Sequence, residues 1–330
     1  MHNTMNKKIL TLTLNPAIDF TVEVPGFCPD SVNRAVSSRR DAGGKGINAA
    51  AAVAGQGLEA GATGFLGRAN KDIFIEHFEK FKLQDEFVYI DGITREGIKI
   101  TDPEKDQTTD INFKGFIVKE EDTVRLIEHF RKIVNGYGFV IISGSLPAGV
   151  DEGIYAEFTK IAKDAGLFVA VDTIGRPLQL AVDSGCVDLI KPNLSELVEI
   201  FGEDGKTDPD SIAGTLLERV GMIALSMGGE GSRLYTRRGT YRASAPPVKV
   251  KSTVGAGDTF LAGFIAGLAG DEGPEACLRN AASWAASKLT KYGAGCSRSE
   301  PPEDFIERIE ITFPAAGPVL PPAGSSRSPC

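Results

Sequence analysis

Residues 120–171, EEDTVRLIEHFRKIVNGYGFVIISGSLPAGVDEGIYAEFTKIAKDAGLFVAV, decide the fold class because helical and strand patterns alternate along them. The spacing of apolar residues predicts helices at Glu120–Val134 and Glu152–Asp164, each followed by a strand, at Phe139–Ile142 and Leu167–Val171. Strands that alternate with helices of about 10–15 residues form crossover units. The segment therefore predicts an α/β protein, with a doubly wound, mostly parallel sheet that carries helices on both faces.

The same alternation extends toward both ends of the chain. Upstream we expect strands at Ile9–Leu14 and Ala60–Leu66 and helices at Gly44–Ala54 and Lys71–Lys82. Downstream we expect strands at Val187–Ile190 and Met222–Ser226, hairpin strands at Ser232–Tyr235 and Thr240–Ala243, and helices from Asn193 and at Ser211–Val220, Gly257–Leu268 and Pro274–Leu289.

Short strand patterns interrupt this rhythm at Asp19–Val24, Val32–Ser38, Phe87–Ile90, Gly97–Ile100 and Thr108–Phe113. We expect them to form a small β-sheet lid, from about residues 15–40 and 87–115, on a single body that spans residues 1–310. The last 17 residues hold five prolines. That composition predicts a proline-rich, disordered tail over residues 311–330.

Charge and cysteine content exclude several classes of protein. The 330 residues carry 36 Lys and Arg against 44 Asp and Glu, a net charge of −8, which argues against a nucleic-acid partner. Five scattered cysteines without a Cys-x-x-Cys pair favour a reducing, cytoplasmic location over a disulfide framework or a zinc site. The apolar stretch 47–67 holds five glycines, so we expect no membrane span there.

The segment Ser252-Thr253-Val254-Gly255-Ala256-Gly257-Asp258-Thr259-Phe260 is a glycine-rich turn that enters a helix. Unpaired N–H groups and the positive end of the helix dipole make such a turn a site for a developing negative charge. Asp258 in the first helical turn could accept a proton from a hydroxyl held there. The alternative is an ordinary helix start with an acidic residue that favours the dipole.

Four further segments have both a functional and a purely structural interpretation. Asp41–Asn48 is a second glycine turn before a helix. Lys45 and Asn48 could contact a ligand there, or the segment is only a tight strand-helix turn with a solvated Lys45. Asn193 and Glu196 have the spacing of a capping box, and their oxygens would also suit a hydrated Mg²⁺. Residues 226–231 form a glycine hairpin or a lip under a nucleotide. Arg95 and Lys99 are protective edge charges or, with Arg34, a phosphate clamp.

Sequence signatures of other nucleotide-binding and hydrolytic folds are missing. Lys45 is followed by Gly46 rather than Ser or Thr, so no Walker A loop is present. No strand runs into G-x-G-x-x-G, and G-x-S-x-G does not occur.

Taken in order, five segments resemble the PfkB/ribokinase family of sugar kinases. They are Leu14–Asp19, Gly43–Asn48, Ser143–Pro147, Lys191–Glu196 and Ser252–Phe260. The resemblance covers roughly residues 8–310. It implies a ribokinase-like fold with a β lid, ATP and Mg²⁺ as cofactors, and a homodimer paired through the lid.

Within the family the chain resembles the branch whose acceptors already carry a phosphate. Asn15-Pro16, Asp19, Lys45, Arg95, Lys99 and Thr109–Phe113 carry that resemblance. It implies ATP-dependent phosphorylation of fructose 1-phosphate, with tagatose 6-phosphate or fructose 6-phosphate as alternative acceptors. Gly97 and Lys114 depart from the branch, which often has Asn and Pro there, and either change would reshape the sugar pocket. A catalytically idle sugar-phosphate sensor and a kinase for unphosphorylated sugars or nucleosides are the rival interpretations.

The resemblance also implies a role for each site residue. Asp258 would be the catalytic base, and Gly255, Ala256 and Gly257 would offer amides to the transferring phosphoryl group. The sugar phosphate would contact Asp19, Gly43, Gly44, Lys45, Asn48, Ser143, Arg95, Lys99 and Arg34. The nucleotide would contact Lys191, Asn193, Ser226, Gly228, Gly229, Gly231, Ser252 and Asn280. Asn193 and Glu196 would hold Mg²⁺ through water.

Overall fold

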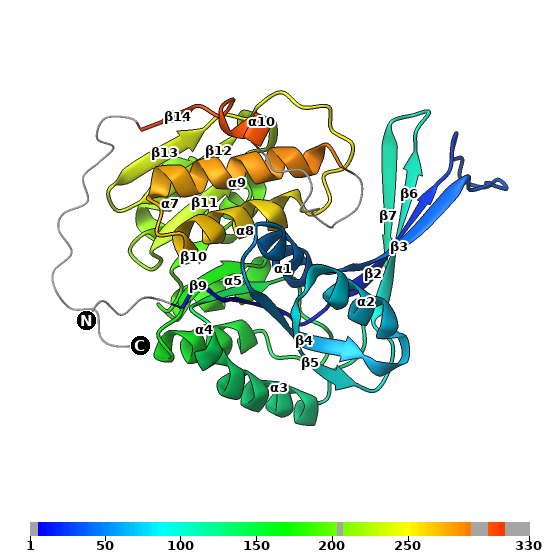
Figure 1. Cartoon of the computed structure of the whole chain (residues 1–330), viewed down its shortest axis with the longest axis horizontal. Helices are drawn as coiled ribbons and strands as arrows, with labels where there is room; N and C mark the ends of the chain where they lie inside the picture. Colours follow the sequence, from blue (N-terminus) through cyan, green and yellow to red (C-terminus); the bar gives the residue numbers. More distant parts are fainter. Residues whose placement is uncertain (1–5, 203–206, 292–302, 314–330) are drawn as a thin grey trace.

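The computed structural model describes residues 6–202, 207–291 and 303–313. Its large sheet has ten strands, and seven of them, in sheet order β5-β4-β1-β8-β9-β10-β11, run parallel (Figure 1). These strands are β5 (Gln84–Ile90), β4 (Ala60–Gly67), β1 (Ile9–Thr13), β8 (Phe139–Ser143), β9 (Phe168–Asp172), β10 (Leu189–Ile190) and β11 (Met222–Ser226). Three antiparallel strands extend the far edge: β12 (Ser232–Thr236), β13 (Gly239–Ala243) and β14 (Ile311–Thr312).

Helices cover both faces of this sheet. One face carries α1 (Lys45–Gly55), α2 (Asp72–Phe81), α8 (Ala256–Ala269) and α9 (Pro274–Leu289). The other carries α3 (Glu120–Ile133), α4 (Ile154–Asp164), α5 (Gly175–Asp183), α6 (Leu194–Phe201) and α7 (Pro209–Leu216). A short helix, α10 (Glu303–Ile306), precedes β14, and 3₁₀ turns lie at Arg68–Asn70, Val134–Gly136 and Gly228–Glu230.

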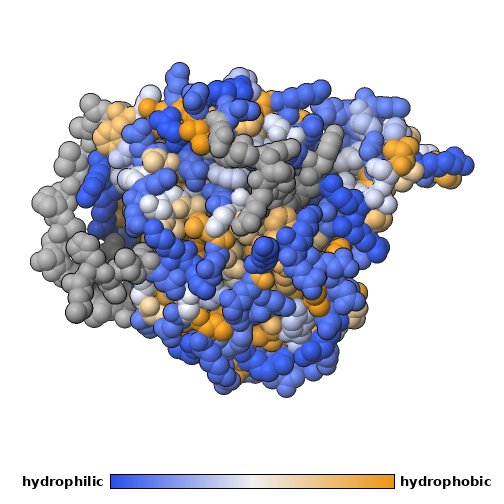
Figure 2. Space-filling view, viewed as in Figure 1, coloured by the Kyte–Doolittle hydropathy of each residue, from blue (hydrophilic) through white to orange (hydrophobic). Residues whose placement is uncertain are grey.

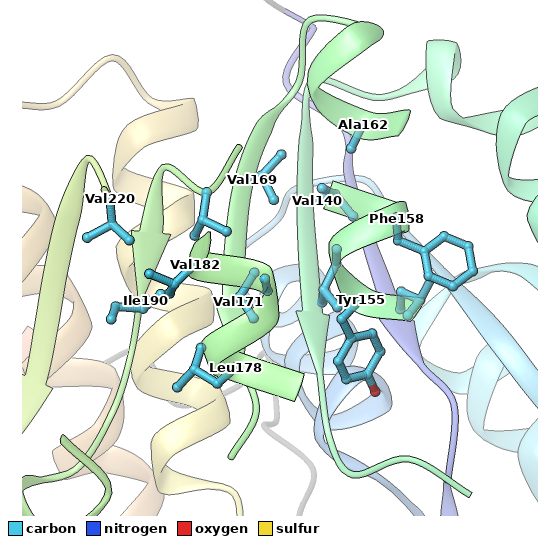
Figure 3. Close-up of a cluster of buried hydrophobic side chains, with 14 of the residues drawn as sticks. Val140, Tyr155, Phe158, Ala162, Val169, Val171, Leu178, Val182, Ile190 and Val220 are labelled. Carbon is cyan, nitrogen blue, oxygen red and sulfur yellow. The ribbon is translucent and has the colours of Figure 1, made fainter. Parts of the chain in front are cut away.

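The core forms two layers, one on each side of the sheet. Central strands such as β1 and β8 are buried along their whole length, because a parallel sheet covered on both faces has no polar side. In Figure 3, Val140, Val169 and Val171 of the sheet meet Tyr155 and Phe158 of α4. Phe158 is fully buried, so its truncation to Ala would cost about 3–5 kcal/mol.

A separate four-stranded sheet, which we call the lid, projects from the body at the right of Figure 1. Its strand order is β3-β2-β6-β7, with β2 (Ala17–Glu23), β3 (Ser37–Gly43), β6 (Arg95–Asp102) and β7 (Gln107–Asn112). Strands β2 and β6 are parallel and form the centre, and β3 and β7 pair with them antiparallel. Because β3 ends at the glycine turn before α1, the lid is joined directly to that helix.

The predicted α/β fold with a lid is confirmed, and three details are corrected. The run Phe87–Ile90 belongs to β5 at the edge of the large sheet and not to the lid. The second lid strand begins at Ser37 rather than near Val32. Ile311 and Thr312, placed in the tail, pair with β13. Residues 314–330 of the predicted tail lie outside the described residues.

Helix α5 had no counterpart among the predicted elements, because Gly175 and Pro177 in its first turn obscure the pattern. Within the described ranges, no helix combines the length and the hydrophobicity that a membrane span requires.

Candidate active site

The two glycine turns identified in the sequence lie at the N-termini of neighbouring helices, α1 and α8. Gly44 precedes α1 with φ of 119°, and a Cβ there would lie 3.0 Å from the Cα of Pro16. Gly255 precedes α8 in the left-handed conformation, with φ of 75°. Both positions favour glycine, and both aim backbone N–H groups at the same side of the sheet.

Asp258 lies in the first turn of α8 and is buried. Its Oδ2 accepts a hydrogen bond of 2.8 Å from Asn48 Nδ2 of α1. Burial raises the pKa of Asp258 to about 6, and the negative charge of Asp172 adds to this effect. The hydrogen bond from Asn48 and the charges of two lysines act in the opposite direction. Such a carboxylate can accept a proton near neutral pH.

Asp172 is a site residue that the sequence reasoning missed. It ends β9, and its buried Oδ1 lies 3.2 Å from Lys45 Nζ and 3.5 Å from Lys191 Nζ. Burial alone would lower the pKa of Lys45, but Asp172 and Asp258 together raise it, so this lysine stays charged. The signal was available, because Asp172 directly follows a predicted strand and ligands bind at the carboxyl ends of parallel strands.

The structure brings Ser143 to the same edge of the sheet. It ends β8, directly beside Asp172 in the strand pairing, and it is buried. Its hydroxyl oxygen has no hydrogen-bond partner among the described residues. A ligand hydroxyl or phosphate oxygen would satisfy this group.

A cavity of about 280 Å³ lies beside the start of α8. Predicted nucleotide or catalytic residues that line it are Ser226, Gly228, Gly231, Ala256 and Gly257. Its apolar wall comes from Phe260 of α8 and from Ala282, Ala285, Ala286 and Leu289 of α9. The short alanine side chains leave a flat surface on α9 against which a planar ring could stack.

Five predicted nucleotide contacts do not line this cavity: Lys191, Asn193, Gly229, Ser252 and Asn280. Gly229 and Ser252 lie beside lining residues. The Asn280 amide donates to the carbonyl of Gly263 at 2.7 Å and to Gln56 Oε1 at 3.3 Å, so it ties α9 to α8 and α1. Helix α9 therefore lines the cavity through its alanines and not through Asn280.

Asn193 and Glu196 form a complete capping box at the start of α6. The backbone N–H of Glu196 donates to Asn193 Oδ1, and that of Asn193 donates to Glu196 Oε2, both at 2.9 Å. Glu196 also contributes to the raised pKa of Lys45, so its negative charge faces the site. Glu196 Oε1 takes no part in the cap.

The base of the lid adds a second group of charged residues. A Cβ at Gly43 would lie 2.7 Å from Asp19 Oδ2, so this glycine makes room for the carboxylate. Burial raises the pKa of Asp19, although Lys99 and Arg95 act against that effect. Lys99 Nζ lies 2.9 Å from Asp110 Oδ1, and Arg95 donates to the carbonyl of Asn15.

Arg34 is not part of this group. It lies exposed in the loop between β2 and β3, beyond Glu23 and Ser37. The pairing of β2 with β6 sets Arg95 against Ala17 and Thr101 against Glu23, so Arg34 and Arg95 lie at opposite ends of the lid.

Comparison with known protein families matches residues 10–301 to the pfkB family carbohydrate kinases. The chain belongs to the pfkB family of carbohydrate kinases. The chain is 40% identical over 265 residues to a 1-phosphofructokinase of Rhodobacter capsulatus, which covers 79% of this chain and 84% of that protein. It is 29% identical over 308 residues to a tagatose-6-phosphate kinase of Staphylococcus epidermidis, which covers 92% of this chain and 99% of the relative.

Among solved structures, the phosphofructokinase-2 of Escherichia coli in complex with substrates and products matches with a TM-score of 0.85 and 25% identity. The match covers 91% of this chain and 98% of that chain. The family resemblance, the fold and the class of enzyme expected from the sequence, a sugar-phosphate kinase, are thereby confirmed. ATP as the phosphoryl donor follows from the family.

Proposed function

We propose that this pfkB-family enzyme transfers the γ-phosphoryl group of ATP to fructose 1-phosphate, forming fructose 1,6-bisphosphate and ADP. The observation that carries the proposal is the buried Asp258, hydrogen-bonded to Asn48 at the N-terminus of α8, between the apolar cavity and the charged base of the lid. The relative that is 40% identical bears the name of this activity.

The reaction needs a base, a cradle for the phosphoryl group and charge to balance the phosphates. The acceptor hydroxyl oxygen forms a bond to the γ-phosphorus, the bond to the ADP oxygen breaks, and the hydroxyl proton passes to Asp258. The N–H groups of Gly255, Ala256 and Gly257 stabilise the negative charge on the phosphoryl oxygens. Lys45 and Lys191, held by Asp172, supply positive charge at the same place.

Magnesium is part of the proposal, and the donor set fits it. Asn193 and Glu196 would hold the ion through water, because Glu196 Oε1 is left over by the capping box and Mg²⁺ retains several waters. When bound, the ion neutralises charge on the phosphate oxygens of ATP.

The sugar phosphate is assigned to the lid side of Asp258. Asp19, Gly43, Gly44, Lys45, Asn48 and Ser143 would contact the sugar hydroxyls, and Arg95 and Lys99 its phosphate. Two cations at the lid favour an acceptor that already carries a phosphate over a plain sugar or a nucleoside. Tagatose 6-phosphate is the second candidate acceptor, since a relative that is 29% identical is named tagatose-6-phosphate kinase.

The test is a panel of hexose phosphates assayed for ADP release with Mg-ATP. We expect fructose 1-phosphate to give the highest kcat/KM. Preference for tagatose 6-phosphate or fructose 6-phosphate would reassign the acceptor within the same mechanism. No ADP release with any of them would contradict the proposal and favour a sensor, and preference for ribose or adenosine would contradict the phosphosugar assignment.

We also propose a homodimer formed through the outer face of the lid. Strand pairing sets Phe20 beside Ile98 and Ile98 beside Ile111, with Val22 and Ile100 in the next row. These side chains share one face, and Ile111 is 44% exposed. Figure 2 shows apolar residues on the lid among polar ones. Because Arg34 lies far from Arg95 within one chain, its predicted phosphate contact would require the lid of a second copy.

Light scattering tests this assembly. We expect a dimer for the wild type and a monomer for Ile98→Arg, and a wild-type monomer would contradict it. The cytoplasmic location stays a prediction; free thiols at Cys28 and Cys277 agree with a reducing compartment.

A further inference from the structure

One row of residues crosses the inner face of the lid at the level of Asp19. Asp19 of β2 pairs with Gly97 of β6, and Gly97 pairs with Asn112 of β7. Directly opposed residues in a sheet present their side chains on the same face, so Asp19 and Asn112 flank Gly97 from either side. Asp19 contacts Gly43 in the glycine turn before α1, which places this face toward the site.

Gly97 leaves the centre of this row without a side chain. A Cβ at that position would lie 3.3 Å from Asn112 Oδ1 and 3.7 Å from Asp19 Oδ1. The Asn112 side chain therefore reaches from the edge strand across the glycine toward Asp19. Glycine inside a strand weakens the sheet and marks places where another group approaches closely. Here the approaching group is the carboxamide of Asn112.

Packing within the lid does not explain why Asn112 takes this position. All residues of β7 are exposed, so solvent could hydrate the amide equally well in an outward position. Within the described ranges, the Asn112 side chain makes no hydrogen bond to the protein. Its donors and its acceptor are thus available next to a carboxylate that already faces the sugar site.

We infer that Asn112 is a specificity-determining residue for the sugar, and that Gly97 allows it to reach the sugar. The inference rests on the proposed function. An ionised carboxylate can only accept hydrogen bonds, whereas a carboxamide both donates and accepts. One sugar hydroxyl can therefore donate a hydrogen bond to Asp19 and accept one from Asn112. In a hexose phosphate with the opposite configuration at that carbon, one of these two side chains is left without its hydrogen bond. Losing such a pairing is what makes a polar site selective.

The experiment compares the wild type with Asn112→Ala, Gly97→Ala and the double variant in the full chain. Thr108→Ala is the matched control, because Thr108 lies on the same strand but pairs with Thr101, four residues away from Asn112 along β7. The measurements are kcat and KM for hexose phosphates that differ at one hydroxyl, KM for ATP, and the thermal midpoint of unfolding.

We expect Asn112→Ala to raise KM for the preferred hexose phosphate about tenfold, since one hydrogen bond to the ligand is lost. The preference over the epimer falls by a similar factor, while KM for ATP and the thermal midpoint stay near those of the wild type. Gly97→Ala acts in the same direction because its Cβ displaces the Asn112 amide. In the double variant the two effects do not add.

Two results would overturn the inference: wild-type kinetics in Asn112→Ala, or fully additive effects of the two substitutions. Both leave the proposed function intact, because the wild type still phosphorylates a hexose phosphate. A wild type that accepts no hexose phosphate would contradict the proposed function and this inference together. A loss in Thr108→Ala as large as that in Asn112→Ala would show that the effect comes from lid stability, and would also overturn the inference.

Discussion

Asn48 Nδ2 donates a hydrogen bond of 2.8 Å to Asp258 Oδ2 and so links the first turns of α1 and α8. The two residues are 210 positions apart in the chain, and each follows a glycine turn. The hydrogen bond stabilises the charged form of a carboxylate that burial pushes toward its neutral form. Asn48 therefore controls how much of the base is ionised at neutral pH.

Asn48→Ala removes that hydrogen bond and raises the pKa of Asp258 above about 6. Because the base must be deprotonated to accept a proton, we expect the acid limb of the kcat profile to move to higher pH. At pH 7 kcat falls about tenfold or more, and part of this loss is recovered at pH 8.5. An unchanged acid limb would contradict the role of Asn48.

Asp172→Asn is expected to shift the same limb in the opposite direction. The charge of Asp172 raises the pKa of Asp258, so removing it lowers that pKa and moves the acid limb to lower pH. The maximal kcat still falls, because Lys45 and Lys191 lose the carboxylate that holds both of them. Profiles of kcat against pH for Asp172→Asn and Asn48→Ala test whether the acid limb moves to lower pH in the first variant and to higher pH in the second.

The raised pKa of Asp258 predicts that the free energy of unfolding depends on pH. Its pKa in the folded chain, about 6, is raised above the usual 3.8, so the folded state favours the protonated form. The associated stability is fully present below about pH 4 and is lost as the pH rises through 6. Asp258→Asn removes the buried charge, so we expect it to stabilise the protein at pH 8 by about 3 kcal/mol.

Thermal unfolding of the wild type and Asp258→Asn at pH 8 and pH 4 tests whether the substitution stabilises the protein at the higher pH only. The variant should unfold several degrees higher at pH 8 and within a degree or so of the wild type at pH 4. A variant that is less stable at pH 8 would show that the carboxylate is stabilised by its surroundings.

Asp110→Asn is expected to strengthen binding of the sugar phosphate. In the structure Asp110 lies 2.9 Å from Lys99 Nζ, so the substrate phosphate must compete with it for that cation. We expect KM for the sugar phosphate to fall severalfold with little change in kcat. Asp106→Asn, also in the lid, is the control. A higher KM in Asp110→Asn would mean that Asp110 orients Lys99 for the phosphate.

Much of this arrangement follows from local patterns in the sequence. The alternation from Glu120 to Val171 is enough for the parallel sheet, and glycine turns followed by Asn48 and Asp258 mark the helix N-termini that form the site. These features depend on residues that are close in the chain. The sheet to which β5 belongs depends instead on long-range pairing, and strand periodicity is the same in either sheet.

The site residues that the sequence missed or misassigned also depend on contacts between distant parts of the chain. Asp172 becomes part of the site only through Lys45 and Lys191, which come from separate segments of the chain. Asn280 lies on a helix that the sequence predicts, but its side-chain amide donates a hydrogen bond to the carbonyl of Gly263 in α8 and does not face the cavity. The alanines that face the cavity carry no chemical signal in the sequence.

The most direct test of the account is ADP release with fructose 1-phosphate and Mg-ATP by the wild type and by Asp258→Asn. We predict rapid turnover by the wild type and a loss of at least about a thousandfold in kcat for the variant, with ATP affinity within about threefold of the wild type. Turnover by Asp258→Asn at the wild-type rate would contradict the assignment of Asp258 as the base.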